Sequence, residues 1–203
     1  MRLKLFPPLS LAVLLVFSAH PSFSQVSAPG VVKTIPVTVG VGVSSYNPDW
    51  NHGRIMGGTM WIDYNPQFLP GRLRGLGIEA EGRDLNMNQS ADQPNLREDV
   101  AAGGAIYNWN RFFAIRPYGK FLMGFGNADY LASNGRRSHQ TRTVTIAGGG
   151  LEIRAYRRLW ARADYEYQWW PDFFRVDTPK QAKLRPQGIS VGVSYHFNQP
   201  AFR

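Results

Sequence analysis

Apolar and polar residues alternate along most of this chain, and Leu159–Trp169 shows the pattern most clearly. Every odd-numbered residue of this stretch is apolar or aromatic, whereas Arg162, Asp164 and Glu166 occupy even positions. Successive side chains of a β-strand point to opposite faces, so the stretch predicts a strand with one apolar and one charged face.

Eight such segments follow one another, each long enough for the roughly 9–11 residues of a tilted membrane-crossing strand. They are Ile35–Ser45, Arg54–Asn65, Leu73–Leu85, Glu98–Trp109, Ile115–Asn127, Arg142–Tyr156, Leu159–Trp169 and Gly188–Phe197. In the sixth segment Val144 and Ile146 have the wrong phase, which predicts a one-residue bulge at Gly148–Gly150. The chain therefore predicts an all-β fold, an eight-stranded antiparallel transmembrane β-barrel that is apolar outside and polar inside.

The connections alternate in length, which suggests the orientation. Long polar connections occur at Tyr46–Gly53, Met87–Arg97, Ala128–Thr141 and Trp170–Gln187, and shorter ones at Pro66–Arg72, Asn110–Ala114 and Arg157–Arg158. Outer-membrane barrels have long loops outside the cell and short turns in the periplasm. We therefore expect both termini to be periplasmic.

Aromatic residues make up 13% of the chain and cluster near the predicted strand ends, as the two interfacial girdles of a membrane barrel would. The predicted periplasmic girdle is Tyr64, Phe68, Trp109, Phe112, Phe113, Tyr195 and Phe197, and the predicted outer girdle is Tyr46, Trp50, Trp169, Trp170, Phe173 and Phe174.

The first 24 residues predict a cleavable signal peptide. Arg2 and Lys4 precede the short apolar run Leu9–Phe17, and Ser22–Ser24 supplies small residues for cleavage. We expect residues 25–34 to form a periplasmic segment, 35–197 the barrel and 198–203 a short tail. The chain has no cysteine, which excludes a disulfide and a thiolate nucleophile.

The formal net charge of +9 indicates anionic partners. In an exported chain we expect these to be outer-membrane lipids and lipopolysaccharide, and we expect no nucleic acid.

The eight-strand layout and the ending Tyr195-His196-Phe197 resemble the small outer-membrane barrels of the OmpA and OmpX type. The resemblance covers Ile35–Phe197. It implies that Tyr195 and Phe197 form the signal read by the barrel-assembly machinery, although six residues follow Phe197 where the aromatic is usually last. We expect no peptidoglycan-binding domain, and we expect a monomer.

The charged residues on the predicted inner face form the first candidate site. An eight-stranded barrel is just wide enough for side chains, so these charges are expected to pair and fill the lumen. The set is Glu79, Glu81, Arg83, Arg116, Lys120, Glu152, Arg154, Arg162, Asp164 and Glu166. A structural polar core and a switchable gate of a low-conductance pore both remain open.

The basic stretch Ser133–Arg142 is the second candidate site. Arg136, Arg137, His139 and Arg142 lie there without an acid, and arginine binds phosphate in a bidentate manner. A solvated loop or a contact with lipopolysaccharide would both fit.

These patterns favour a structural, surface-interaction or low-conductance porin-like protein, without a metal, a cofactor or catalysis. Two alternatives remain. A lipid-modifying enzyme would need a serine such as Ser138 bonded to His139. A secreted ligand-binding barrel would have the inverse pattern, apolar inside and polar outside.

Overall fold

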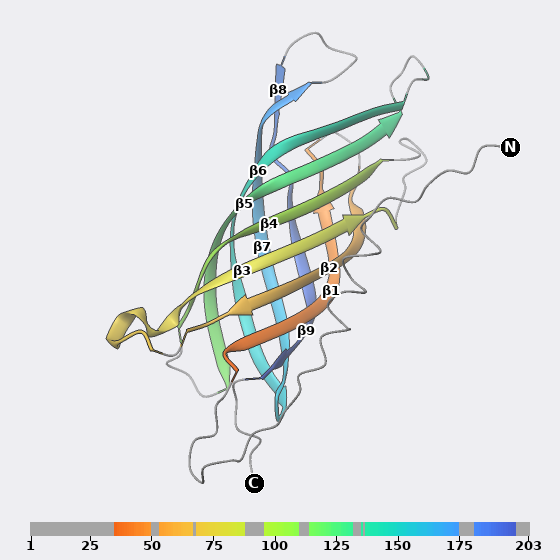
Figure 1. Cartoon of the computed structure of the whole chain (residues 1–203). Helices are drawn as coiled ribbons and strands as arrows, with labels where there is room; N and C mark the ends of the chain where they lie inside the picture. Colours follow the sequence, from red (N-terminus) through yellow and green to blue (C-terminus); the bar gives the residue numbers. More distant parts are fainter. Residues whose placement is uncertain are drawn as a thin grey trace, which may run out of the picture. The chain divides into compact units, whose positions relative to one another are not determined.

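The computed structural model describes residues 35–49, 53–66, 68–87, 96–109, 114–131, 135, 137–174 and 181–197, with the side chains of 172–174 and 181–182 left aside. The chain divides into Met1–Lys33 and Thr34–Arg203, and the described residues all belong to the second unit. They form β1 (Val37–Asn47), β2 (Ile55–Tyr64), the short 3-10 helix η1 (Gly71–Gly75), β3 (Leu76–Leu85), β4 (Arg97–Asn108), β5 (Ile115–Leu131), β6 (Arg137–Tyr156), β7 (Leu159–Phe174), β8 (Gln181–Leu184) and β9 (Gln187–His196) (Figure 1).

Eight of these strands close into an antiparallel barrel. Strands β1 to β6 pair in sequence order, β6 pairs with β7, β7 with β9, and β9 with β1. The short strand β8 pairs only with the end of β7, as far as the described residues show. The predicted fold, an eight-stranded antiparallel barrel, is confirmed.

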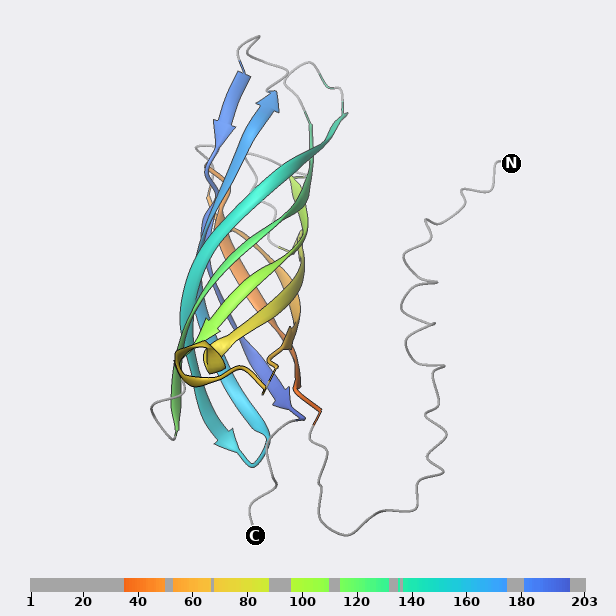
Figure 2. The ribbon, with the colours of Figure 1, turned by 60° about the vertical axis from the view of Figure 1, so that its left-hand side comes forward.

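The barrel has two distinct ends, visible in Figure 2. We call the end where β1 begins and β9 finishes the terminal end, which also carries η1 and the β6–β7 turn. At the opposite end, the loop end, β5 pairs with β6 as far as Leu131 opposite Arg137, and β7 pairs with β8. These two hairpins extend past the point where β6 and β7 last pair, Thr145 opposite Trp169.

Several strand boundaries differ from the prediction. Residues 137–141 belong to β6 and 128–131 to β5, where a loop was predicted, and β8 lies inside the predicted loop Trp170–Gln187. In these segments the backbone pairing continues although apolar residues no longer alternate with polar ones. Alternation in the sequence detects a strand only where one of its faces is apolar. At the other end, residues 73–75 belong to η1 and not to β3.

The outer face of the barrel is apolar and exposed. Valines of β1 and β9, Met60 and Ile62 of β2, and Phe121, Met123 and Phe125 of β5 all point outward, with Phe125 67% exposed. A continuous exposed apolar surface marks contact with lipid or a partner. It contradicts the alternative of a secreted ligand-binding barrel, which requires a polar exterior.

The aromatic girdle is found in part. Tyr64, Phe68, Trp109, Tyr195 and Phe197 are exposed at the terminal end, and Trp169 is exposed toward the loop end. Tyr46 and Trp170 were placed wrongly, because both are fully buried in the lumen. Trp50, Phe112 and Phe113 lie outside the described residues, as do the side chains of Phe173 and Phe174.

The predicted bulge in β6 is wrong. Pairing of β6 with β7 runs without a shift through Gly148–Gly150, and the irregularity lies between Arg154 and Tyr156. Val144 and Ile146 therefore keep the inward phase and are fully buried in the lumen. The two side chains are apolar although they point inward, because the interior of the barrel around them is apolar.

Among the described residues, no helix is long and apolar enough to span a membrane.

Candidate functional site

Eight charged side chains form one buried cluster in the lumen, which we call the central network. Its members come from the four strands β2, β3, β5 and β7: Asp63, Glu79, Glu81, Arg83, Lys120, Arg162, Asp164 and Glu166. Each residue is less than 10% exposed. The inward phase of these strands therefore brings together charges that are up to 103 residues apart in sequence, in a space with little access to water.

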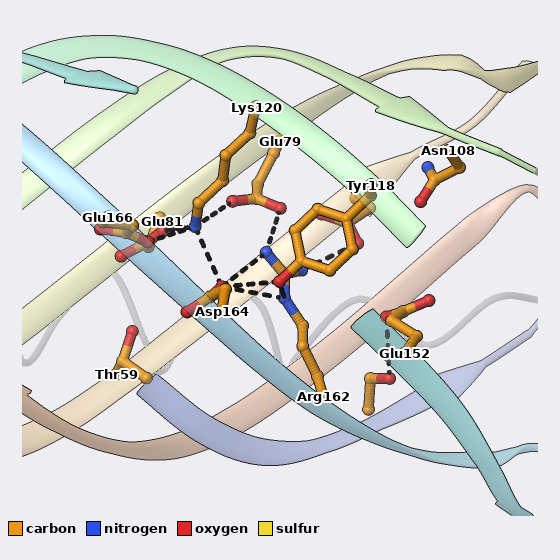
Figure 3. A network of polar contacts seen from close by, with 12 residues as sticks. Thr59, Glu79, Glu81, Asn108, Tyr118, Lys120, Glu152, Arg162, Asp164 and Glu166 are labelled. Atoms are coloured by element: carbon orange, nitrogen blue, oxygen red, sulfur yellow. Dashed lines mark hydrogen bonds and ion pairs between the residues drawn. The ribbon is translucent and has the colours of Figure 1, made fainter. Parts of the chain in front are cut away.

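Lys120 lies at the centre of this network (Figure 3). Its Nζ is 3.0 Å from Glu79 Oε1, 2.6 Å from Glu81 Oε2 and 3.3 Å from Asp164 Oδ2, and it also pairs with Glu166. One ammonium group thus links β5 to carboxylates on β3 and β7, across the lumen.

Arg162 forms the second node, nearer the terminal end. Its Nη2 is 2.8 Å from Glu79 Oε2 and 3.3 Å from Asp164 Oδ2, and its Nη1 is 3.5 Å from Asp63 Oδ2. The guanidinium lies over the rings of Trp61 and Tyr118, with Cζ 4.6 and 4.4 Å from the centroids. Ion pairing and ring stacking together hold this cation in place.

Arg83 forms the third node, nearer the loop end. It pairs with Glu81 and Glu166 and lies over the ring of Tyr46, with Cζ 4.1 Å from the centroid. The Tyr46 hydroxyl donates a 2.6 Å hydrogen bond to Glu166 Oε2. Tyr46 therefore joins the central network to the apolar residues beyond it.

Asp63, Tyr46 and Tyr118 are the members of this site that sequence reasoning missed. Asp63 was available from the pattern, because it lies on the same face of β2 as Thr59 and Trp61. Tyr118 donates a 2.8 Å hydrogen bond to Asp164 Oδ2. A tyrosine in the sequence does not by itself indicate that its hydroxyl will bind a buried carboxylate.

Three predicted members lie outside the central network, nearer the terminal end. Glu152 pairs with His196, Oε2 to Nε2 at 3.4 Å, and Ser194 Oγ donates to Glu152 Oε1 at 3.3 Å. The guanidinium of Arg116 lies over Trp160, 4.4 Å from the ring centroid, and Arg154 Nε donates to the carbonyl of Arg157. Seven of the ten predicted residues thus lie in the central network, and these three lie nearer the terminal end.

A buried apolar layer fills the loop-side half of the lumen and was not expected from a polar-inside rule. It consists of Tyr46, Ile55, Leu85, Leu96, Val100, Ala102, Leu122, Ala128, Tyr130, Val144, Ile146, Trp170 and Leu184. The central network is therefore covered on its loop side by mostly apolar side chains, among which Glu98 and Gln168 are also buried.

Two tryptophans need glycines opposite them in the lumen. A Cβ at Gly40 would lie 2.2 Å from Cε2 of Trp61, and one at Gly126 would lie 2.2 Å from Cη2 of Trp170. These glycines make room for the indoles, so ring and glycine together fill the cross-section.

Replacing Ile146 with valine tests this apolar layer. We expect the free energy of unfolding to fall by about 0.5–1.5 kcal/mol, because a buried methyl group is lost. Ile153→Val on the outward face of the same strand is the matched control, since no cavity forms at an exposed position. Equal losses in urea titrations of the two variants would contradict the inward phase of Ile146.

The basic stretch does not form the acid-free loop that was predicted. His139 and Arg137 lie in β6 with outward phase and are exposed, but Asp129 of β5 stands opposite His139 and pairs with it. Arg142 has the inward phase, so it does not share their surface. Arg136 lies outside the described residues.

The geometry gives no support to a Ser138–His139 catalytic pair. Neighbouring residues of a strand point to opposite faces, so Ser138 and His139 do not meet. His139 instead pairs with Asp129. In the part of the chain that the structure describes, no group of three His, Cys, Asp or Glu side chains is arranged to hold a metal ion.

At the end of β9, Tyr195 and the following Phe197 lie side by side on the outer surface. Their rings meet edge to face with centroids 4.8 Å apart. Both are partly exposed at the terminal end.

Comparison with solved structures identifies similar barrels. Neisserial surface protein A (NspA) matches with a TM-score of 0.55 and 17% identity, over 79% of this chain and 96% of that one. Ail, the attachment invasion locus protein of Yersinia pestis, matches with a TM-score of 0.50 and 16% identity, over the same shares of the two chains. At this identity the likeness concerns the fold alone. No protein of curated function matches the sequence.

The sequence matches the family described as outer membrane protein beta-barrel domain over residues 9–197, which is nearly the whole chain. The closed barrel, its apolar exterior and its filled lumen agree with this match. The chain belongs to the outer membrane protein beta-barrel family.

Proposed function

We propose that this protein is a sealed barrel of the bacterial outer membrane with a structural or surface-interaction role, and that it is not a pore or an enzyme. The observation that carries the proposal is the filling of the lumen in two layers, the central network and the apolar layer. Ions crossing the barrel would have to displace both.

The proposed orientation puts the terminal end in the periplasm and the loop end outside the cell. It is supported by the protruding β5–β6 and β7–β8 hairpins at one end and by the two-residue β6–β7 turn at the other. Outer-membrane barrels have this asymmetry. A cleaved signal peptide at residues 1–24, the periplasmic segment 25–34 and the tail 198–203 complete the proposal.

The surface role is assigned to the loop-end hairpins. Arg137 and His139 face outward there, and arginine matches phosphate geometry, so lipopolysaccharide is the proposed contact. Asp129 balances part of this charge, which makes Arg137 the stronger candidate of the two. Tyr195 and Phe197 remain the proposed signal for the barrel-assembly machinery.

Conductance in planar bilayers tests the sealed lumen. We expect the folded protein to produce no stable conductance steps, because the side chains of the central network and of the apolar layer fill the lumen. Leu122→Ser, which puts a hydroxyl into that layer, serves as a comparison for leakage. Regular steps from the unmodified protein would contradict the proposal and revive the low-conductance gate.

A further inference from the structure

Asp63, near the end of β2, is the least well paired acid of the central network. Its side chain is buried, and its Oδ2 lies 3.5 Å from Arg162 Nη1, which is the longest ion pair in the network. No described group donates a hydrogen bond to its other oxygen, Oδ1, which is also buried. An ionised carboxylate in this position would be costly, because a buried charge needs close partners and hydrogen bonds.

A second acid stands directly opposite Asp63. Glu79 pairs with Asp63 in the register of β2 and β3, and both side chains point into the lumen. Their carboxyl groups are within hydrogen-bonding reach of each other. An ionised carboxylate has no proton to donate, so two carboxyl groups can share a hydrogen bond only when one of them is protonated. If both were ionised, they would repel each other.

The surrounding cations decide which of the two acids holds the proton. Glu79 faces two cations, with Lys120 Nζ 3.0 Å from its Oε1 and Arg162 Nη2 2.8 Å from its Oε2. Asp63 has only the 3.5 Å contact with Arg162. The geometry therefore favours an ionised Glu79 and a neutral Asp63.

The charge balance around Asp63 points the same way. The five acids of the central network face three cations, so complete ionisation would leave two negative charges without a partner in a space with little water. The charged or titratable groups around Asp63 come from five other strands: Glu79 on β3, Tyr118 on β5, Glu152 on β6, Arg162 on β7 and His196 on β9. Strand β1 adds Thr38, which stands opposite Asp63. His196 is paired with Glu152, so it supplies no cation to Asp63.

We propose that Asp63 is a proton-binding site inside the folded barrel, which keeps its proton at neutral pH and donates a hydrogen bond to Glu79. An aspartic acid in the unfolded chain ionises at about pH 4. Between about pH 5 and pH 8 only the folded state then holds this proton, so the barrel loses stability as the pH rises, by about tenfold in the unfolding equilibrium constant for each pH unit. A paired, ionised carboxylate has the opposite effect, because it stabilises the fold at neutral pH and loses this contribution in acid. The lumen is thus held together more firmly as the medium becomes acidic, whichever way the barrel is oriented in the membrane.

Replacing Asp63 with asparagine tests this site, because an amide has nearly the shape of a neutral carboxylic acid and also donates to Glu79. The full chain, folded in lipid vesicles, is unfolded with urea at several values between about pH 5 and pH 8. We expect D63N to be as stable as the parent at about pH 5 and to show a weaker pH dependence, by one proton. By about pH 7 its unfolding equilibrium constant is expected to be about a hundredfold smaller than that of the parent.

Asp164→Asn is the matched control, since it makes the same change in the same network. Asp164 Oδ2 accepts a 2.8 Å hydrogen bond from the Tyr118 hydroxyl and lies 3.3 Å from both Lys120 Nζ and Arg162 Nη2, as an ionised carboxylate does. We expect D164N to be less stable than the parent at every pH and to keep the pH dependence of the parent. Titration of His196 and of the buried Glu98 is common to the three proteins, so it cancels when they are compared.

Two results would overturn the site. A D63N protein that keeps the pH dependence of the parent, or that is destabilised at every pH as D164N is, would show that Asp63 is ionised in the folded barrel. Infrared spectra of the parent give a second measurement, which does not require the variant to fold. We expect the carbonyl band of a neutral carboxyl group at about pH 7, and we expect isotopic labelling of aspartate to shift it. A parent protein without such an aspartate band would also overturn the site.

Discussion

Replacing Lys120 with methionine is expected to lower the free energy of unfolding by about 3–5 kcal/mol, since removing one partner of a buried ion pair leaves uncompensated charge. Lys120 contacts four carboxylates, Glu79, Glu81, Asp164 and Glu166. The central network already holds five carboxylates, these four and Asp63, against three cations. Without Lys120 only two arginines would remain to balance them. Equilibrium urea unfolding in lipid vesicles, followed by tryptophan fluorescence, measures the loss.

Glu81→Gln is the matched control for this prediction. It changes a residue of the same network, but it removes a negative charge, the sign that is in excess there. The amide also keeps an oxygen that can accept a hydrogen bond from Lys120. We expect it to cost much less than the lysine variant. A Lys120→Met protein as stable as the parent would show that the central network does not stabilise the lumen, and a larger loss for Glu81→Gln would contradict the charge balance described above.

Replacing Val191 with arginine is expected to cost about 2–4 kcal/mol, the penalty for a cation on the lipid face at the bilayer midplane. Val191 is 54% exposed, lies near the middle of β9 and pairs with Val43 and Ala163 on its two sides. The outward apolar band is continuous around it, so the guanidinium would enter hydrocarbon. The same urea titration in vesicles measures the effect.

Thr141→Arg is the control, because Thr141 is also exposed with outward phase but lies near the loop end of β6, past its last pairing with β7. There the added charge is expected to be tolerated. If Val191→Arg and Thr141→Arg were equally stable, the outer face of the barrel would not be the surface that contacts lipid.

Strand number, order and face could be predicted from the sequence, because period-two alternation is strong wherever one face is apolar. The inward phase of Glu79, Arg162 and Glu166 followed from the same rule. The same alternation also places the side chains of Tyr46 and Trp170 on the inward face of their strands, where the structure has them. Their position near strand ends suggested a girdle, and the phase was the better guide.

The apolar layer could not be predicted in the same way. A polar-inside rule treats Val144 and Ile146 as residues of the wrong phase, and it therefore predicts a bulge. In the folded barrel they meet Leu122 and Trp170 from other strands, within one buried cluster. Which lumen positions are apolar depends on neighbours across the barrel, and this information is absent from any single strand.

Mobility on gels with and without boiling tests the central claim, a closed barrel that inserts in a membrane, most directly. The chain is folded in detergent and treated with protease before electrophoresis. We expect a faster-migrating band that disappears on boiling and a protease-protected core that corresponds to residues 35–197. A protein that stays in solution without detergent, migrates identically with and without boiling, and is fully digested would contradict the account.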